Sequence, residues 1–212
     1  LIVCGSATTW MTGKLLGDKG GLHNRVTRKL YLAPFTLGET AEFLHNNGVK
    51  WTHHQIAECY MIMGGTPYYL DMIDKSMGLP ANIDKLFFEE GAELSKEYDI
   101  LFRSLFKDAT IYRRIVEQLA KKSAGMTREQ LASAIKMSDG GKLSEALDNL
   151  ISCDFLRKYN AFGNLNKGAI YQLTDLYTLF YLKWVKENAE HNATQWSETI
   201  DSPRHRAWSG YA

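Results

Sequence analysis

The stretch ATIYRRIVEQLAKK, residues 109–122, opens the segment that decides the fold of this chain. Two further amphipathic runs follow it, TREQLASAIK at 127–136 and KLSEALDNLISC at 142–153. The breaks between the runs, Ser123-Ala124-Gly125 and Ser138–Gly141, are small and contain glycine. Apolar residues recur at helical spacing within each run, so we predict three short helices.

Two short apolar runs come next, FLRKY at 155–159 and AIYQL at 169–173. Such runs predict strands, and the small, polar residues Asn160–Gly168 between them predict the loop of a hairpin. Three helices followed by a hairpin is the order of a winged-helix domain. We assign it to residues 107–175.

Further helices are predicted upstream. Thr36 and Glu39 have the spacing of a capping box before a helix at 37–47. Thr52 caps a second helix in the same way, and its apolar face holds Ile56, Tyr60 and Met63.

A glycine-proline joint, Gly64-Gly65-Thr66-Pro67, ends that helix and opens another predicted at 67–77. Beyond Pro80, near-helical apolar spacing continues to Phe106 and predicts one or two long helices. Gly91 and the polar residues around Ser95 are the expected breaks.

The two ends of the chain suggest missing neighbours. The apolar run Leu1–Cys4 predicts a buried strand, which rarely opens a domain, so we infer truncation upstream. Alternation over Val26–Leu32 predicts a second strand. An aromatic helix is predicted from Asp175 with its stripe in the core, and the polar stretch 188–212 is expected to lead to another domain.

Composition excludes several classes of protein. The 25 Lys and Arg residues against 24 Asp and Glu leave no global field for nucleic acid or an anionic membrane. Three widely spaced cysteines without a CxxC pair fit a reducing compartment, so we expect a cytoplasmic location. The longest apolar run, near 176–185, contains Lys183 and is shorter than the ~20 residues that span a bilayer.

Four motifs in order, LIVCGS (1–6), YLAPF (31–35), GGTPYYL (64–70) and YQLTD (171–175), resemble the archaeal-type ATPase family. These are AAA+/STAND-like ATP-binding proteins. The fold class is then mainly α with small β elements. The resemblance implies four parts, which are a remnant of the α/β ATPase core at 1–50, a helical lid at 51–106, the winged helix at 107–175, and an aromatic helix with a linker toward a missing restriction-endonuclease-like domain at 176–212.

The resemblance also implies nucleotide-binding residues. Ser6 is similar to a sensor residue facing the phosphates, although capping a helix is the commonest use of serine at such a turn, and both roles are compatible. Gly65 and Pro67 are similar to a lid element that lies against the adenine, although proline is also common at a first helical turn. Arg25 and Arg28 are similar to cations that face a phosphate or a neighbouring subunit, although solvated arginines at a strand edge are the more common case.

The phosphate-binding loop GxxxxGK[ST] does not occur in the sequence, and no acidic Walker B strand precedes Leu1. We therefore assign ATP and Mg²⁺ to the full-length protein and expect no cofactor, catalytic residue or hydrolysis in this chain. The adjacent His53 and His54 point to different faces of a helix and predict surface residues rather than metal ligands. The expected partners are the rest of the ATPase core and a protein effector.

The alternative function is DNA binding through the wing and the first helix of the winged helix. The helix at 142–153 carries Glu145 and Asp148, which disfavour a polyanion. Docking or lid regulation is therefore placed ahead of DNA. The residues that would contact DNA are Arg113, Arg114, Lys142, Asn149, Arg157, Lys158 and Lys167.

Overall fold

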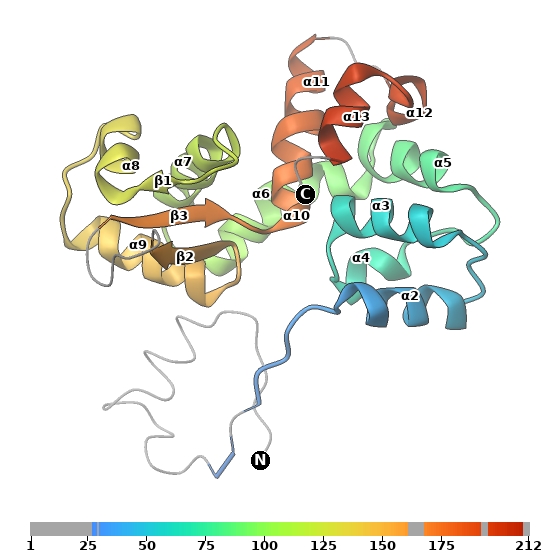
Figure 1. Cartoon of the computed structure of the whole chain (residues 1–212), viewed down its shortest axis with the longest axis horizontal. Coiled ribbons are helices and arrows are strands. Elements are labelled where there is room, and N and C mark those ends of the chain that lie inside the picture. Colours follow the sequence, from blue (N-terminus) through green and yellow to red (C-terminus); the bar gives the residue numbers. More distant parts are fainter. Residues whose placement is uncertain (1–26, 29, 161–167, 192–194, 210–212) are drawn as a thin grey trace. The chain divides into compact units, whose positions relative to one another are not determined.

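The computed structural model describes residues 27–28, 30–160, 168–191 and 195–209. Within these ranges the chain is mainly helical with a small antiparallel sheet, which confirms the predicted fold class (Figure 1). The predicted strand Leu1–Cys4 lies outside the described residues. No described helix is both long and apolar enough to cross a bilayer. The chain divides into two compact units, described separately below.

Unit 1 contains the segment Asp99–Thr174. The three predicted helices and both hairpin strands are confirmed here, and the hairpin is joined by a strand of two residues, too short to show alternation in the sequence. The elements in chain order are α7 (Ala109–Ala120), β1 (Met126–Thr127), α8 (Arg128–Ala134), α9 (Gly141–Ser152), β2 (Leu156–Asn160) and β3 (Ala169–Leu173).

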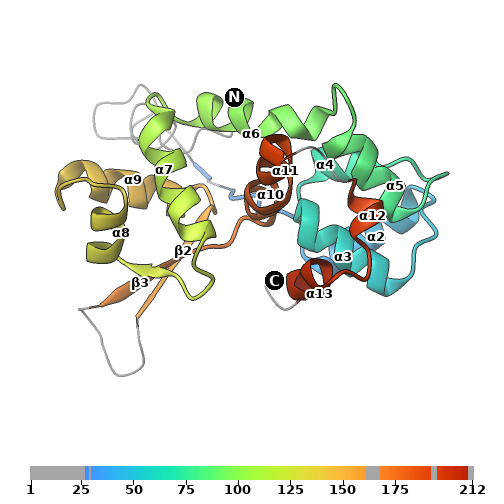
Figure 2. The same cartoon turned by 90° about the horizontal axis from the view of Figure 1, so that it is seen from above.

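The sheet of unit 1 has the strand order β1-β3-β2 with both pairs antiparallel. Leu156 pairs with Leu173, and Lys158 with Tyr171, so these side chains share one face. Leu156, Tyr171 and Leu173 are buried. Helices α7 and α9 contact β3 and β2, as the view in Figure 2 helps to follow. The other face carries Arg157, Tyr159, Ile170 and Gln172.

Unit 2 contains Ala33–Tyr98 and the chain from Asp175 onward. Both predicted capping boxes are confirmed, Thr36 with Glu39 and Thr52 with Gln55. Its elements are α2 (Leu37–Asn46), α3 (His53–Met63), α4 (Pro67–Asp71), α5 (Leu79–Ile83), the π-helical turn η2 (Asp84–Phe88), α10 (Leu176–Phe180), the π-helical turn η3 (Tyr181–Val185), α11 (Lys186–His191), α12 (Trp196–Thr199) and α13 (Pro203–Ser209).

One helix is shared. Helix α6 (Glu93–Leu105) begins in unit 2, and its residues from Asp99 onward belong to unit 1. The expected break at Gly91 is confirmed, because this glycine has a φ of 84° between η2 and α6. Ser95, the other expected break, lies inside α6, where its hydroxyl donates to the carbonyl oxygen of Ala92 at 2.6 Å.

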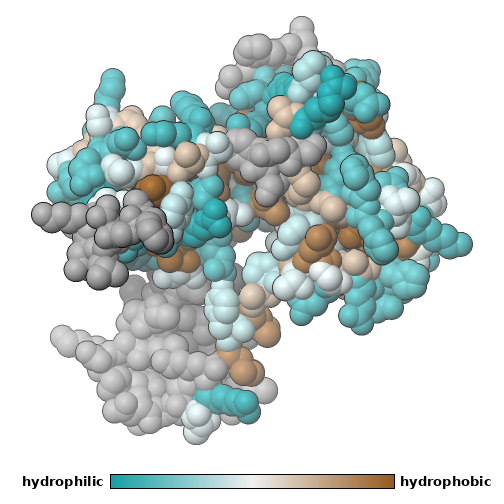
Figure 3. All heavy atoms as spheres, viewed as in Figure 1, coloured by the Kyte–Doolittle hydropathy of each residue, from teal (hydrophilic) through white to brown (hydrophobic). Residues whose placement is uncertain are grey.

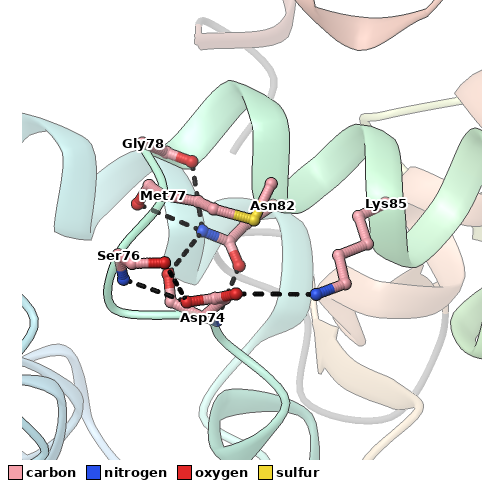
Figure 4. A network of polar contacts seen from close by, with 6 residues as sticks. All are labelled: Asp74, Ser76, Met77, Gly78, Asn82 and Lys85. Carbon is pink, nitrogen blue, oxygen red and sulfur yellow. Dashed lines mark hydrogen bonds and ion pairs between the residues drawn. The ribbon is translucent and has the colours of Figure 1, made fainter.

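The helix predicted at 67–77 is too long, because α4 ends at Asp71. A polar turn replaces its second half (Figure 4). The Asp74 carboxylate accepts from the backbone N–H of Ser76 at 3.0 Å and from its hydroxyl at 2.6 Å. The buried Asn82 amide donates to the carbonyl oxygens of Asp74, Met77 and Gly78. These bonds compete with the helical hydrogen bonds that the backbone would otherwise form.

The strand predicted at Val26–Leu32 is wrong for the residues that can be described. Residues 27, 28 and 30–32 have no strand structure, and the side chains of Leu30 and Leu32 are 77% and 89% exposed. Alternation alone does not make a strand, because the backbone also needs a paired neighbour. Among the described strands, β1 and β2 both pair with β3.

The aromatic helix predicted from Asp175 is confirmed as core. Asp175 caps α10 by accepting from the Thr178 backbone N–H at 2.7 Å, and Tyr177, Phe180 and Trp184 are buried. The sequence pattern did not reveal α12 and α13. Their tryptophans, Trp196 and Trp208, pack edge-on against Phe180 with ring centres 5.2 and 5.6 Å away.

Candidate functional site

Two of the motif segments meet in unit 2. The backbone N–H of Phe35, in YLAPF, donates to the carbonyl oxygen of Gly65, in GGTPYYL, at 2.8 Å. The Tyr60 hydroxyl donates to the Phe35 carbonyl oxygen at 3.2 Å. A Cβ on Gly65 would lie 1.8 Å from that same oxygen, so only glycine fits. We call this contact the Phe35–Gly65 joint.

Pro67 begins α4 directly after the joint. It is exposed, and the N-cap Thr66 makes no side-chain capping bond. The neighbouring Tyr68 is 62% exposed, which is high for an aromatic side chain. The visible surface in Figure 3 is mostly hydrophilic, with hydrophobic residues in small groups. The joint therefore presents a proline and a tyrosine to solvent on a backbone held by Gly65.

Three further residues were predicted to bind nucleotide. Ser6 and Arg25 lie outside the described residues. Arg28 is exposed and has no hydrogen-bond or ion-pair partner in the part of the chain that the structure describes. Nucleotide binding by these three residues, and by Gly65 and Pro67, stays a prediction.

The two arginines of α7 are engaged within unit 1. Arg113 forms an ion pair with the Asp99 carboxylate at 3.0 Å and also donates to the Asp99 carbonyl oxygen at 3.1 Å. Arg114 donates to the carbonyl oxygen of Ile135, just after α8. These guanidinium groups brace α7 against α6 and the end of α8. Contact with DNA phosphates would compete with these bonds.

Helix α9 offers little to a polyanion. The Asn149 amide is half-buried and donates to the Tyr112 hydroxyl at 2.8 Å, so it connects α9 to α7. Lys142 is exposed at the start of the helix. Glu145 and Asp148 are exposed as well, and they offset its charge.

Strand β2 places its two cations on opposite faces of the sheet. Arg157 donates through Nε to Gln172 Oε1 at 2.7 Å, and its guanidinium lies 5.5 Å from the centre of the Tyr159 ring. Lys158 Nζ lies 5.8 Å from the centre of the Tyr171 ring. Lys167 lies outside the described residues.

Sequence reasoning missed Tyr159 and Gln172. The Tyr159 hydroxyl donates to the Ala124 carbonyl oxygen at 3.1 Å, and the Gln172 amide donates to the Ser123 carbonyl oxygen at 2.6 Å. Alternation within β2 already placed Arg157 and Tyr159 on the same side of that strand. The pairing register between β2 and β3, which sets Gln172 on the same face, could not be predicted.

The described residues contain no group of three or more His, Cys, Asp or Glu side chains that could hold a metal ion. His53 and His54 are exposed in the first turn of α3, which confirms the prediction of surface histidines.

Comparisons with known proteins give one named relative and leave the family open. No family model matches the chain, and no solved structure matches it. The chain is 26% identical over 190 residues to an uncharacterized protein of Methanocaldococcus jannaschii, MJECL04. The alignment covers 89% of this chain and 41% of that protein. This chain therefore spans less than half the length of the relative.

Proposed function

We propose that this chain is the lid and winged-helix region of an ATP-binding protein of the AAA+/STAND-like class. In this proposal the lid belongs to unit 2, and residues 107–175 form the winged helix. The region couples the nucleotide state of an ATPase core to a partner or effector domain. ATP and Mg²⁺ are bound mainly by residues of that core.

The Phe35–Gly65 joint carries the proposal. The motifs YLAPF and GGTPYYL, which resemble the family, are at least 29 positions apart in the sequence. They nevertheless share a backbone hydrogen bond between Phe35 and Gly65. The same contact leaves no room for a side chain at Gly65. A rigid backbone beside an exposed proline suits a surface that lies against a flat base, because neither element must be ordered when the ligand binds.

The order of elements in unit 1 supports the winged-helix assignment. A helix, a short strand, two helices and a hairpin follow one another, and the sheet order is β1-β3-β2. Because the first strand pairs with the last, the hairpin is tied back to the loop after α7. Residues 161–167, between β2 and Gly168, lie outside the described residues.

The connections between the units supply a route for coupling. The chain passes from unit 2 to unit 1 within α6 and returns between Thr174 and Asp175. A helix transmits a displacement along its axis because its backbone is hydrogen-bonded throughout. Asp175 fixes the start of α10 immediately after the return. We therefore propose that closure of the lid changes the conformation of unit 1 through these two covalent links.

DNA binding through the wing and the first helix, α7, with Asn149 of α9, is the less favoured function. Arg113, Arg114 and Asn149 already bind groups of unit 1. Losing these bonds would have to be offset by each new contact. Docking of a protein effector requires no such exchange.

The test measures ATP binding by the full-length protein that contains this chain. Pro67→Ala is expected to weaken binding of MgATP. Pro80→Ala is the matched control, because Pro80 lies in the first turn of α5 in the same unit, as Pro67 does in α4. Equal effects of the two substitutions on nucleotide affinity would contradict the assignment of Pro67. An upstream sequence without a phosphate-binding loop would contradict the proposal as a whole.

A further inference from the structure

One face of the unit 1 sheet is open. Arg157 and Tyr159 of β2 pair with Gln172 and Ile170 of β3, so their side chains share the face opposite the buried one. Arg157 and Tyr159 are exposed, and Gln172 and Ile170 are half-buried. We call these four residues the outer sheet face.

Tyr159 lies across this face. Its strand, β2, is on one side of β3, and its hydroxyl reaches Ala124 in the segment before β1, on the other side of β3. Gly125, the residue after Ala124, packs closely against β3, because a Cβ at Gly125 would lie 2.6 Å from the Tyr171 carbonyl oxygen. The tyrosine ring is thus fixed at both ends and still 38% exposed. Its conformational entropy is already lost before any ligand binds.

The described contacts of the ring include one cation, Arg157. Arg157 uses Nε to bind Gln172, and its guanidinium lies 5.5 Å from the ring centre, which leaves its terminal nitrogens without a partner among the described residues. Lys121 and Lys122 are exposed directly before Ser123, whose carbonyl oxygen accepts from Gln172. Lys122 Nζ donates to Gln130 Oε1 at 3.3 Å, so Lys121 is the more available of the two lysines. The contacts described for Arg157, Tyr159 and Gln172 include no carboxylate.

We propose that the outer sheet face binds single-stranded nucleic acid. A base stacks on the Tyr159 ring, and Arg157 with Lys121 at the end of α7 binds the adjoining phosphates. An exposed aromatic ring on a sheet, flanked by cations, matches an unpaired base and its backbone. In a duplex the bases are already stacked on one another and the ring would find no partner. This site lies in unit 1 and uses no residue of α9 or of the Phe35–Gly65 joint.

The experiment titrates the full chain into a fluorescein-labelled single-stranded oligo(dT) and follows fluorescence anisotropy at several salt concentrations. Tyr159→Ala is expected to weaken binding about fivefold to a hundredfold, the range for loss of one stacked base. Tyr159→Phe keeps the ring but loses its bond to Ala124, so it should lose much less affinity than Tyr159→Ala. Arg157→Ala should lower the slope of log affinity against log salt by about 0.7, the value for one phosphate contact on a single strand.

Lys107→Ala is the control for charge elsewhere in unit 1, because Lys107 is exposed between α6 and α7. Its affinity and salt slope should match those of the parent. Binding of a duplex as tight as the single strand, or equal affinities of the parent and Tyr159→Ala with an intact circular dichroism spectrum, would overturn the proposal. Failure of ATP binding would leave it untouched, because the oligonucleotide is measured without nucleotide.

Discussion

His205 Nε2 lies 2.9 Å from Glu58 Oε1, and this contact joins α13 to α3 within unit 2. Both side chains are mostly buried, with 16% and 17% of their surfaces exposed. The pair therefore holds the end of the described chain to a helix formed far earlier in the sequence.

Removing the Glu58 carboxylate should loosen the attachment of α13. Glu58→Ala leaves the His205 ring without its partner, and we expect a loss of about 1–3 kcal/mol, typical of a buried polar group left unsatisfied. Glu58→Gln keeps an acceptor for the ring N–H and should lose less. Urea unfolding followed by tryptophan fluorescence measures both, and equal losses would show that the hydrogen bond contributes nothing.

The joint should tolerate no side chain at Gly65. Gly65→Ala places a methyl group on the Phe35 carbonyl oxygen, so the backbone must move, and we expect a cost of about 1–3 kcal/mol or more. Gly141→Ala is the matched control, because a Cβ there meets nothing within 4 Å. That substitution, at the start of α9, should leave the melting temperature unchanged or raise it slightly. A stable Gly65→Ala protein would contradict the described packing.

Unit 2 should lose stability in alkaline solution. Burial, and then the charge of Glu58, raises the pKa of the Cys59 thiol from 9.0 to about 12. The folded state thus keeps this proton while the unfolded chain releases it, so stability is fully present below pH 9 and falls as the pH rises toward 12. Burial also raises the pKa values of Tyr69 and Tyr177, which adds to the same trend.

Thermal unfolding at pH 8 and pH 10 measures this alkaline loss. Cys59→Ala should show a smaller difference between the two pH values than the parent, because one of the retained protons is gone. The native protein should also leave Cys59 unreacted with a thiol reagent at pH 8, where the thiolate is scarce. Rapid labelling of Cys59 in the folded state would contradict its burial.

Trp196 should be the main anchor of the α12–α13 segment. Its side chain is fully buried against Phe180 and Trp184. Trp196→Ala is expected to cost about 3–5 kcal/mol, as for other large core aromatics. Ile200→Ala removes an apolar side chain from the same segment that is 39% exposed, and it should cost far less. Hydrogen exchange across 195–209 would separate local release from loss of the whole unit.

Local signals in the sequence predicted much of the fold. Thr36 and Glu39 are three residues apart and bind each other's backbone, so the start of α2 was predictable. The end of α4 depends on Asn82, which lies outside that helix and binds the 74–78 turn through contacts no spacing rule contains. Strand β1 exists only because Met126 pairs with Tyr171, 45 positions away.

The candidate site residues also differ in how far the sequence could predict them. Gly65 and Pro67 were singled out from their motif, and the structure adds the reason why Gly65 must be glycine, its contact with Phe35. Arg113 and Arg114 were expected to be available because they are charged. Their engagement depends on Asp99 and Ile135, which the sequence does not place beside them. Tyr159 was overlooked because its partner, Ala124, lies across the sheet.

The division of the chain has a consequence for synthesis on the ribosome. Asp99–Thr174 of unit 1 is continuous, whereas unit 2 is built from Ala33–Tyr98 and from residues that follow Thr174. Within unit 2, helices α2 to α5 therefore leave the ribosome before the later helices of the same unit. Their apolar surfaces stay uncovered until α10 and the tryptophans of α12 and α13 have been translated. The segment Asp99–Thr174 of unit 1 is thus fully synthesised before unit 2 can complete its fold.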